Sequence, residues 1–415
     1  MLDPNALETR TMSRRNPTRR VPRGAARTVP FAGRRRRLGF TLVELLVVIL
    51  VIALLAALLL PAITGAIRTA KNAAVQAEIS QMAQALADFK SKYGEYPPSR
   101  ILLAENGFYN TQDTTPIASI SGFSGETDMT VGQLAARSLT YLRRFFPRVA
   151  LSTSQPLYGS GTINPGAWLD FNGNGGTGPD PQYVLQGHEC LVFFLGGIPQ
   201  QTSAGTYGMT GFAKNPQNPF LNATVAPNRQ PPLFEFNGAR LVADPTKNVG
   251  IPGYVDSLGN QYGFYAYFSA YGSNGYDPND VNFPEVDDTT NTSPMMRNFF
   301  VNFPVYTASG GSSTFAGAGG TQSNAVSPSP NPYTSGPPAD PAGKPTIYQN
   351  PQTFQIVSSG SDGIFGIGGI YVTNTSSEAL PLTSATSDFY SPSTNNGLRT
   401  VERDNLTNFK NGKLE

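Results

Sequence analysis

The chain has one histidine and one cysteine, which lie two residues apart in the segment GHECLVFF. A thiol beside an imidazole is the pair that cysteine nucleophiles use. The sequence indicates no third group that would orient the His188 imidazole. We therefore expect Cys190 to be a small buried residue at the start of a strand and His188 to be a partly buried residue at its edge. The sequence also lacks the G-x-S-x-G, H-E-x-x-H and Walker patterns, so we predict that the protein is not an enzyme.

A second pattern is typical of calcium loops. The segment DFNGNG at 170–175 has the D-x-N-x-N-G spacing, in which alternate side-chain oxygens point inward and the glycine turns the chain. An EF-hand would place a bidentate glutamate at the twelfth position, which is Pro181 here, and Asp180 stands one place earlier. The helices that frame an EF-hand are not indicated, so we favour an ordinary Asn/Gly turn and keep calcium binding as the alternative. The candidate calcium ligands are Asp170, Asn172, Asn174 and Asp180.

Glu44 is the third candidate functional residue, because it is a carboxylate inside a run of apolar residues. From Phe40 to Leu60 only Thr41 and Glu44 have polar side chains among 21 residues. A helix of that length spans about 31 Å, which is close to the hydrocarbon thickness of a bilayer. An acidic side chain costs roughly 2.5–3.5 kcal/mol at the centre of such a helix, and somewhat less near an end. Glu44 therefore needs a partner.

The basic residues are concentrated before this apolar run. Residues 1–39 hold eleven arginines and a net charge of +9, whereas residues 40–415 carry −7. Arginine runs are found in nucleic-acid-binding proteins, but four of these arginines directly precede the apolar helix, which is typical of a cytoplasmic flank. We therefore expect no nucleic-acid partner, a cytoplasmic N-terminus and export of the chain beyond residue 61. Met1 and Met12 are alternative starts.

The segment GFTLVE at 39–44 closely resembles the cleavage and methylation site of type IV prepilins and type II secretion pseudopilins. The resemblance implies that a membrane-embedded prepilin peptidase cuts between Gly39 and Phe40 and that Phe40 becomes the methylated first residue. It also implies that Glu44 is the family's assembly glutamate and that Pro61 is the proline at which pilin helices commonly bend. The leader is then 1–39 and the transmembrane helix 40–61.

Cleavage would create an α-amino group four residues before Glu44. A buried carboxylate and a buried ammonium are each costly alone and tolerable together. We therefore expect Glu44 of one subunit to pair with the Phe40 amine of a neighbour and to help set the axial register of a filament. The alternative is a plain signal anchor with Glu44 near the lipid headgroups, but such an anchor gives no reason for the G-F-T-L-x-E spacing.

The helix is expected to continue beyond Pro61 as an amphipathic stem over 62–97. Gly94 and the two prolines that follow it end the helix at about Tyr93. One face must pack on a folded domain, while the other meets water or neighbouring subunits. The apolar face, with its spacing of three and four, consists of Val75, Ile79, Met82, Leu86, Phe89 and Tyr93. The polar face consists of Lys71, Glu78, Gln81, Asp88 and Lys92.

Residues 98–415 form the expected exported head, which is far larger than that of a typical small pseudopilin. One further helix is predicted after the capping box Thr130-x-x-Gln133. The rest is predicted to be strands and long Gly- and Pro-rich loops, with a low-complexity loop over 307–345. The predicted fold class is α+β, with the long N-terminal helix packed on an antiparallel sheet. The strand candidates are 191–195, 262–270, 299–305, 353–358 and 369–373.

Two further segments are similar to the major pseudopilin of type II secretion, often called protein G. One is the helix end, ALADFKSKYGEYPPS. The other is FQIVSSGSDGIFG at 354–366, which resembles the strand and loop that end the pseudopilin head, where acidic side chains and carbonyls often hold calcium. Asp362 matches that pattern, although the second acid that usually follows is absent. Calcium is therefore the candidate cofactor, at either loop, and the sequence establishes none with certainty.

Together these patterns predict a structural subunit of a type II secretion pseudopilus or of a type IV pilus-like filament. The implied partners are the prepilin peptidase, other pilin or pseudopilin subunits and the inner-membrane assembly platform. The implied location is the bacterial inner membrane, with the head periplasmic or extracellular. The alternative, from the binding class, is a non-polymerising membrane-anchored protein that uses a pilin-like stem.

Overall fold

The structure is a computed structural model. It describes residues 40–117, 129–157, 168–175, 182–203, 206–243, 250–258, 263–271, 275–277, 280–281, 304–306, 312–314, 330–335, 347–363, 365, 368–369, 371, 380 and 402–414. The predicted leader and most of the predicted low-complexity loop lie outside these residues. The chain divides into two compact units, Met1–Pro61 and Ala62–Glu415.

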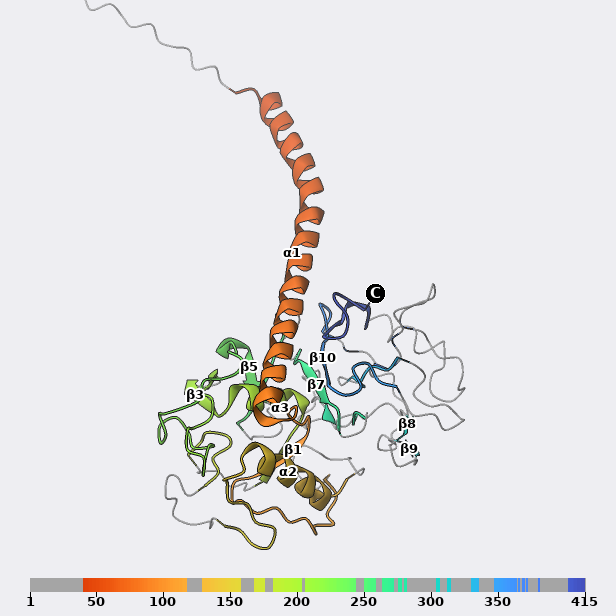
Figure 1. The fold of residues 1–415 in the computed structure, drawn as a ribbon. Coiled ribbons are helices and arrows are strands. Elements are labelled where there is room, and N and C mark those ends of the chain that lie inside the picture. The colour runs from red at the N-terminus through yellow and green to blue at the C-terminus, as the bar shows by residue number, and fades with distance from the viewer. Residues whose placement is uncertain are drawn as a thin grey trace, which may run out of the picture. The chain divides into compact units, whose positions relative to one another are not determined.

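Helix α1 runs without interruption from Leu42 to Tyr93 and contains Pro61 (Figure 1). Its end is the predicted one: the Gly94 N–H donates to the Lys90 carbonyl at 2.7 Å, and Gly94 has a φ of 87°, which suits glycine. In the second unit the predicted apolar face is buried, and Val75, Ile79, Met82, Leu86 and Phe89 are fully inaccessible to solvent.

Helix α2 spans Val131–Phe145 and begins at the predicted capping box. The Thr130 hydroxyl oxygen accepts from the Gln133 N–H at 3.2 Å, and the Gln133 side chain accepts from the Thr130 N–H at 2.9 Å. The Phe145 ring meets the Phe89 ring of α1 edge to face, with centroids 5.1 Å apart. This contact joins the second helix to the stem.

Helix α3 spans Gly187–Gly196, so the predicted strand over 191–195 is wrong. Every residue of this helix is buried. A short, wholly buried apolar run has no polar face, and periodicity therefore cannot distinguish a helix from a strand. The sequence feature that favours a helix is Glu189 near the N-terminus of α3, which accepts a hydrogen bond from the Gln186 N–H at 2.9 Å.

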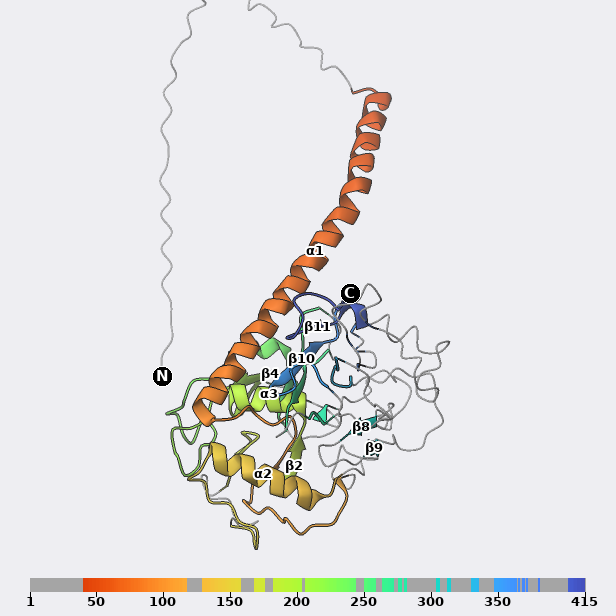
Figure 2. The same cartoon turned by 45° about the vertical axis from the view of Figure 1, so that its right-hand side comes forward.

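The strands form small antiparallel sheets rather than one large sheet. The three-stranded sheet has the order β11 (Leu406–Thr407), β10 (Phe354–Ser358), β7 (Ala266–Ser269). Figure 2 labels β10 and β11, and Figure 1 labels β7 beside β10. The others are pairs: β1 (Ile101–Ala104) with β2 (Gln182–Leu185), β3 (Pro199–Ser203) with β4 (Thr206–Met209), β5 (Leu241–Ala243) with β6 (Pro252–Tyr254), and β8 (Pro304–Tyr306) with β9 (Ser312–Thr314).

The strand predictions therefore have different outcomes. The strand predicted over 353–358 is confirmed as β10, and the one predicted over 262–270 is confirmed in its second half as β7. Of the one predicted over 299–305, only the last two residues are described, and they belong to β8. Of the strand predicted over 369–373, only Gly369 and Tyr371 are described, and both lie outside the strands. Each is hydrogen-bonded to the backbone of Thr334 at 2.8 Å.

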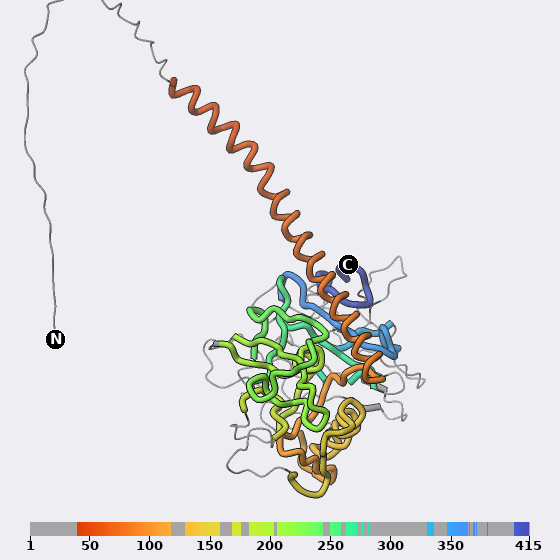
Figure 3. The backbone as a smooth tube through the Cα atoms, turned by 60° about the vertical axis from the view of Figure 1, so that its left-hand side comes forward, coloured from red at the N-terminus to blue at the C-terminus, as the bar shows by residue number. Residues whose placement is uncertain are grey.

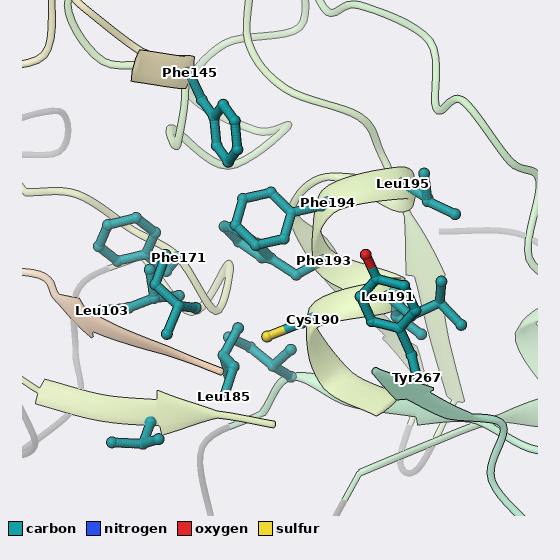
Figure 4. Close-up of a cluster of buried hydrophobic side chains, with 14 of the residues drawn as sticks. Leu103, Phe145, Phe171, Leu185, Cys190, Leu191, Phe193, Phe194, Leu195 and Tyr267 are labelled. Atoms are coloured by element: carbon teal, nitrogen blue, oxygen red, sulfur yellow. The ribbon is translucent and has the colours of Figure 1, made fainter. Parts of the chain in front are cut away.

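The main core lies around α3. Figure 4 shows Cys190, Phe193 and Phe194 pointing from this helix toward side chains of β1, β2 and α2. The core contains residues of the stem helix, of α2 and α3, and of several strands. The predicted α+β class is therefore confirmed. Short 3₁₀ turns at Gly238–Arg240 and Glu402–Asp404 complete the described elements.

Candidate functional site

The start of α1 is a capping box made by Thr41 and Glu44. The Glu44 Oε2 atom accepts from the Thr41 N–H and from the Thr41 hydroxyl, both at 2.9 Å. In return the Thr41 Oγ1 atom accepts from the Glu44 N–H at 3.2 Å. Glu44 thus has a partner inside its own chain, and the T-x-x-E spacing was the signal for it.

This box belongs to the chain on the mature side of the predicted cut. Gly39 lies outside the described residues, whereas Phe40 is described and is 75 % exposed. Cleavage before Phe40 leaves the Thr41 N–H as an ordinary amide. The capping box therefore does not depend on the leader, and the new Phe40 amine would lie one residue from it.

The apolar side chains that follow are left exposed by the described part of the chain. The large apolar side chains of α1 between Leu42 and Ile67 are exposed, with fractions between 45 % and 78 %. A continuous apolar surface of this kind needs lipid or other subunits to cover it. This helix is long and apolar enough to cross a membrane, and it includes Pro61, which the structure places inside it.

Glu78 is the main polar attachment of the stem helix to the head, and here the prediction of a water-facing residue is wrong. Its two oxygens accept from Arg240 Nη1 and Nη2 at 2.8 and 2.7 Å. They also accept from the hydroxyls of Tyr254 at 2.8 Å and Tyr265 at 2.5 Å. Burial alone would raise the pKa of Glu78, but the bonds from Arg240 and the two tyrosines outweigh it and lower the pKa. A stripe drawn on a helical wheel cannot show that a charged residue meets a buried counter-charge.

The C-terminal segment also lies against the stem helix, as Figure 3 shows in blue beside α1. The Gln76 side chain donates to the Thr407 carbonyl at 3.1 Å and accepts from the Gly412 N–H at 3.4 Å. Eight residues earlier along the same helix, Arg68 lies 3.7 Å from the Asp404 carboxylate. The second half of α1 is thus held by head residues that are more than three hundred positions away in sequence.

The predicted calcium loop at 170–175 is closed by its own first residue. The Asp170 Oδ2 atom accepts from the Gly175 N–H and from the Asn222 side chain, both at 3.0 Å. The Asn172 Oδ1 atom accepts from the Asn174 N–H at 3.1 Å. Asp180 lies outside the described residues. The start of the loop lies beside Glu105, since the Leu169 N–H donates to the Glu105 carbonyl at 3.1 Å. The sequence pattern did not indicate Glu105.

The other predicted calcium residue, Asp362, is exposed in the turn after β10. The structure brings a second acid to this turn from the far end of the chain. Asp404 accepts from the N–H and the hydroxyl of Ser361, at 2.8 and 2.5 Å. Within the described residues no three His, Cys, Asp or Glu side chains are grouped as a metal site, so calcium at either loop would also need amide or carbonyl oxygens.

His188 and Cys190 lie in the first turn of α3 rather than on a strand, and both are fully buried. The prediction of a partly exposed His188 is therefore wrong. Its ring packs against Phe264, with centroids 4.9 Å apart. The Cys190 thiol points into the apolar core, and this part of the expectation is confirmed (Figure 4). Residues at i and i+2 of a helix point in different directions, so this position does not favour a nucleophile–base pair.

A buried ionic cluster supports the loop after β7 and was not expected from spacing. Arg100 lies at 2.5 Å from Asp277 and at 3.2 Å from Asp280, and Arg137 of α2 joins both carboxylates. Burial raises the pKa of Asp280, and the Asp277 charge adds to this effect while the two arginines oppose it. The cluster has two positive and two negative charges, so it is balanced and acts as a structural brace.

Comparison with protein-family models gives one match, over residues 34–60, to the prokaryotic N-terminal methylation motif. Comparison with curated proteins and with solved structures gives no match. The matched residues contain the four arginines, the predicted cut and the capping box described above. The chain therefore carries a prokaryotic N-terminal methylation motif, of the prepilin type that the residues at 39–44 resemble.

Proposed function

We propose that the protein is a structural subunit of a type II secretion pseudopilus or of a type IV pilus-like filament. The observation that carries the proposal is the combination, within one helix, of a prepilin-type motif and an apolar surface that the described chain leaves uncovered. A subunit with such a helix is stored in the bilayer and then moves into a filament core, where neighbouring helices replace lipid.

Maturation by prepilin peptidase would cut after Gly39, and Phe40 would be methylated. The Glu44 carboxylate of one subunit then pairs with the Phe40 amine of a neighbour, which fixes the axial register of the two helices. The arginines before the helix keep the N-terminus cytoplasmic, and the head is periplasmic or extracellular. The partners are other pilin-like subunits and the inner-membrane assembly platform. The similarity of the stem end and of the 354–366 segment to the major pseudopilin favours the pseudopilus.

Crosslinking through the stem distinguishes this function from a non-polymerising anchored binding protein. The single native cysteine, Cys190, is buried and gives little background. Leu55→Cys introduces a thiol on the exposed apolar part of α1, where Leu55 is 54 % exposed. Oxidation in native membranes should give a ladder of crosslinked species, and the ladder should weaken when Glu44→Ala is added. Only monomer in the oxidised sample, with the thiol shown to be reactive, would contradict assembly and favour the anchored binding protein.

A further inference from the structure

We propose that the 170–175 loop and Glu105 together bind a calcium ion in the head, as a function separate from filament assembly. The sequence pattern alone leaves this loop open between a calcium site and an ordinary turn. Three features of the structure favour the ion: a free buried oxygen, a second buried carboxylate beside it, and a neighbouring arginine whose nitrogens bond to backbone carbonyls.

The free oxygen belongs to Asp170, whose residue is only 4 % exposed. Its Oδ2 atom is held by Gly175 and Asn222, whereas its Oδ1 atom is buried and has no hydrogen-bond partner among the described residues. A buried carboxylate oxygen without a donor is costly. The bond from the sixth residue to the first, together with the left-handed Gly175 (φ 82°), folds the loop around its first side chain. Calcium loops of this spacing use their first residue as a ligand and a glycine at the sixth position to turn.

The second carboxylate is that of Glu105, which directly follows β1 and is 2 % exposed. The Tyr183 hydroxyl of β2 donates to its Oε1 atom at 2.5 Å, which fixes the side chain. The backbone bond from Leu169 to Glu105 holds the start of the calcium loop against the end of β1. Two rigid elements, β1 with β2 and the closed loop, therefore bring the two carboxylates together.

The nearby arginine is bonded elsewhere. Arg229 lies close enough for its charge to interact with Asp170. Its nitrogens donate to the backbone carbonyls of Thr210, Gly211, Leu221 and Ala226.

The donor atoms favour calcium over other divalent ions. Carboxylate, amide and carbonyl oxygens are hard ligands, which suit Ca²⁺ or Mg²⁺ rather than Zn²⁺ or copper. Mg²⁺ demands a near-ideal octahedron, whereas Ca²⁺ accepts irregular sets of six to eight oxygens, including water. A loop that contributes one side-chain oxygen plus a carboxylate from another element is irregular in this sense.

Trp168 makes the proposal testable because it is the only tryptophan of the chain and lies two residues before Asp170. The detergent-solubilised full-length protein is stripped with EGTA and titrated with Tb³⁺ while Trp168 is excited. We expect saturable terbium emission that Ca²⁺ displaces with a dissociation constant on the order of 10⁻⁴–10⁻³ M, as in extracellular calcium modules. Mg²⁺ should displace it at least tenfold more weakly.

Three variants test whether the metal binds at Asp170 and Glu105. Asp170→Asn and Glu105→Gln should each weaken Ca²⁺ binding at least tenfold, whereas Asp362→Asn, in the exposed turn after β10, should leave it unchanged. Circular dichroism and the Trp168 emission maximum check folding, and Glu105→Gln carries the test if Asp170→Asn does not fold, because glutamine still accepts from Tyr183. The proposal is overturned by terbium emission that Ca²⁺ does not displace, by unchanged binding in Glu105→Gln, or by loss of binding in Asp362→Asn alone.

Discussion

Glu44 has a local partner in the structure and a proposed partner in the filament. In the single chain its Oε2 atom accepts two hydrogen bonds from Thr41, which reduces the cost of a carboxylate near the end of an apolar helix. In the filament its charge would meet the Phe40 amine of a neighbour. The first role needs only an acceptor, whereas the second needs a negative charge, and substitutions can separate the two.

Glu44→Gln should therefore assemble as poorly as Glu44→Ala, although it retains the capping box. Both variants should still be cleaved, because the cut lies between Gly39 and Phe40. The measurement is filament yield in sheared fractions, normalised to mature subunit in the membrane. Wild-type yield for Glu44→Gln together with a low yield for Glu44→Ala would show that capping, and not charge pairing, is what assembly requires.

Glu105 gives a pH-dependent prediction whose sign follows from its raised pKa. In the ion-free protein the folded chain keeps a proton on Glu105 up to about pH 7, whereas the unfolded chain releases it near pH 4.5. Stability therefore falls as pH rises through this window. Glu105→Gln removes this loss, so in EGTA its free energy of unfolding at pH 8 should exceed that of the wild type by roughly 1–3 kcal/mol. The difference should shrink at pH 5.

At pH 8 calcium should make the wild type more stable than Glu105→Gln, because only the wild type has the second carboxylate. Thermal unfolding of both proteins in EGTA and in calcium provides the measurement. Asp88→Asn is the matched control, since Asp88 is exposed on α1 and should show neither effect. Equal melting temperatures of the wild type and Glu105→Gln at both pH values would contradict the buried, partly protonated state of Glu105.

At the scale of the elements, the stem helix is held to the head by apolar packing and by a partly buried charged contact at Glu78. Glu78 joins α1 to Arg240 just before β5, to Tyr254 of β6 and to Tyr265 just before β7. The Arg240 guanidinium also lies over the Tyr254 ring, 4.3 Å from its centroid. Removing one partner of such a cluster leaves the others buried without compensation.

Glu78→Ala should therefore destabilise the protein by about 2–4 kcal/mol, somewhat less than a fully buried pair would give, because Glu78 and Arg240 are partly exposed. Asp88→Ala on the same helix should cost less than about 0.5 kcal/mol. Denaturant unfolding followed by Trp168 fluorescence compares the two. Similar losses in both variants would mean that the Arg240 contact does not explain the effect.

The sequence predicted the elements that carry their own local signals. Helix α1 had a continuous stripe and a glycine stop, α2 had a capping box, and β10 had a run of β-forming residues before a glycine turn. Helix α3 was missed because its residues are buried on every side, so the pattern that distinguishes helix from strand is absent.

The candidate sites also differ in whether local spacing could predict them. The 39–44 motif and the 170–175 loop are local in sequence and could be read from spacing. Glu105 beside Asp170, Asp404 beside Ser361 and Arg240 on Glu78 are contacts between distant segments, and only the fold brings these residues together.

At the scale of the whole molecule, the account assigns separate tasks to the two ends of α1. Its first part, through Pro61, is an uncovered apolar surface for the bilayer and for neighbouring subunits. Its second part is built into a head whose loops hold the proposed calcium site. The proposed function depends on the leader being removed, since the Phe40 amine exists only after cleavage.

The mass of the N-terminal peptide, taken from native membranes, shows whether the leader is removed. We predict a peptide that begins at a methylated Phe40. In a Gly39→Leu variant the leader should remain, because the bulky side chain replaces the small residue before the cut. An intact leader in the wild type, or a terminus at another residue, would contradict the account and leave the chain as a single-span anchor for its head.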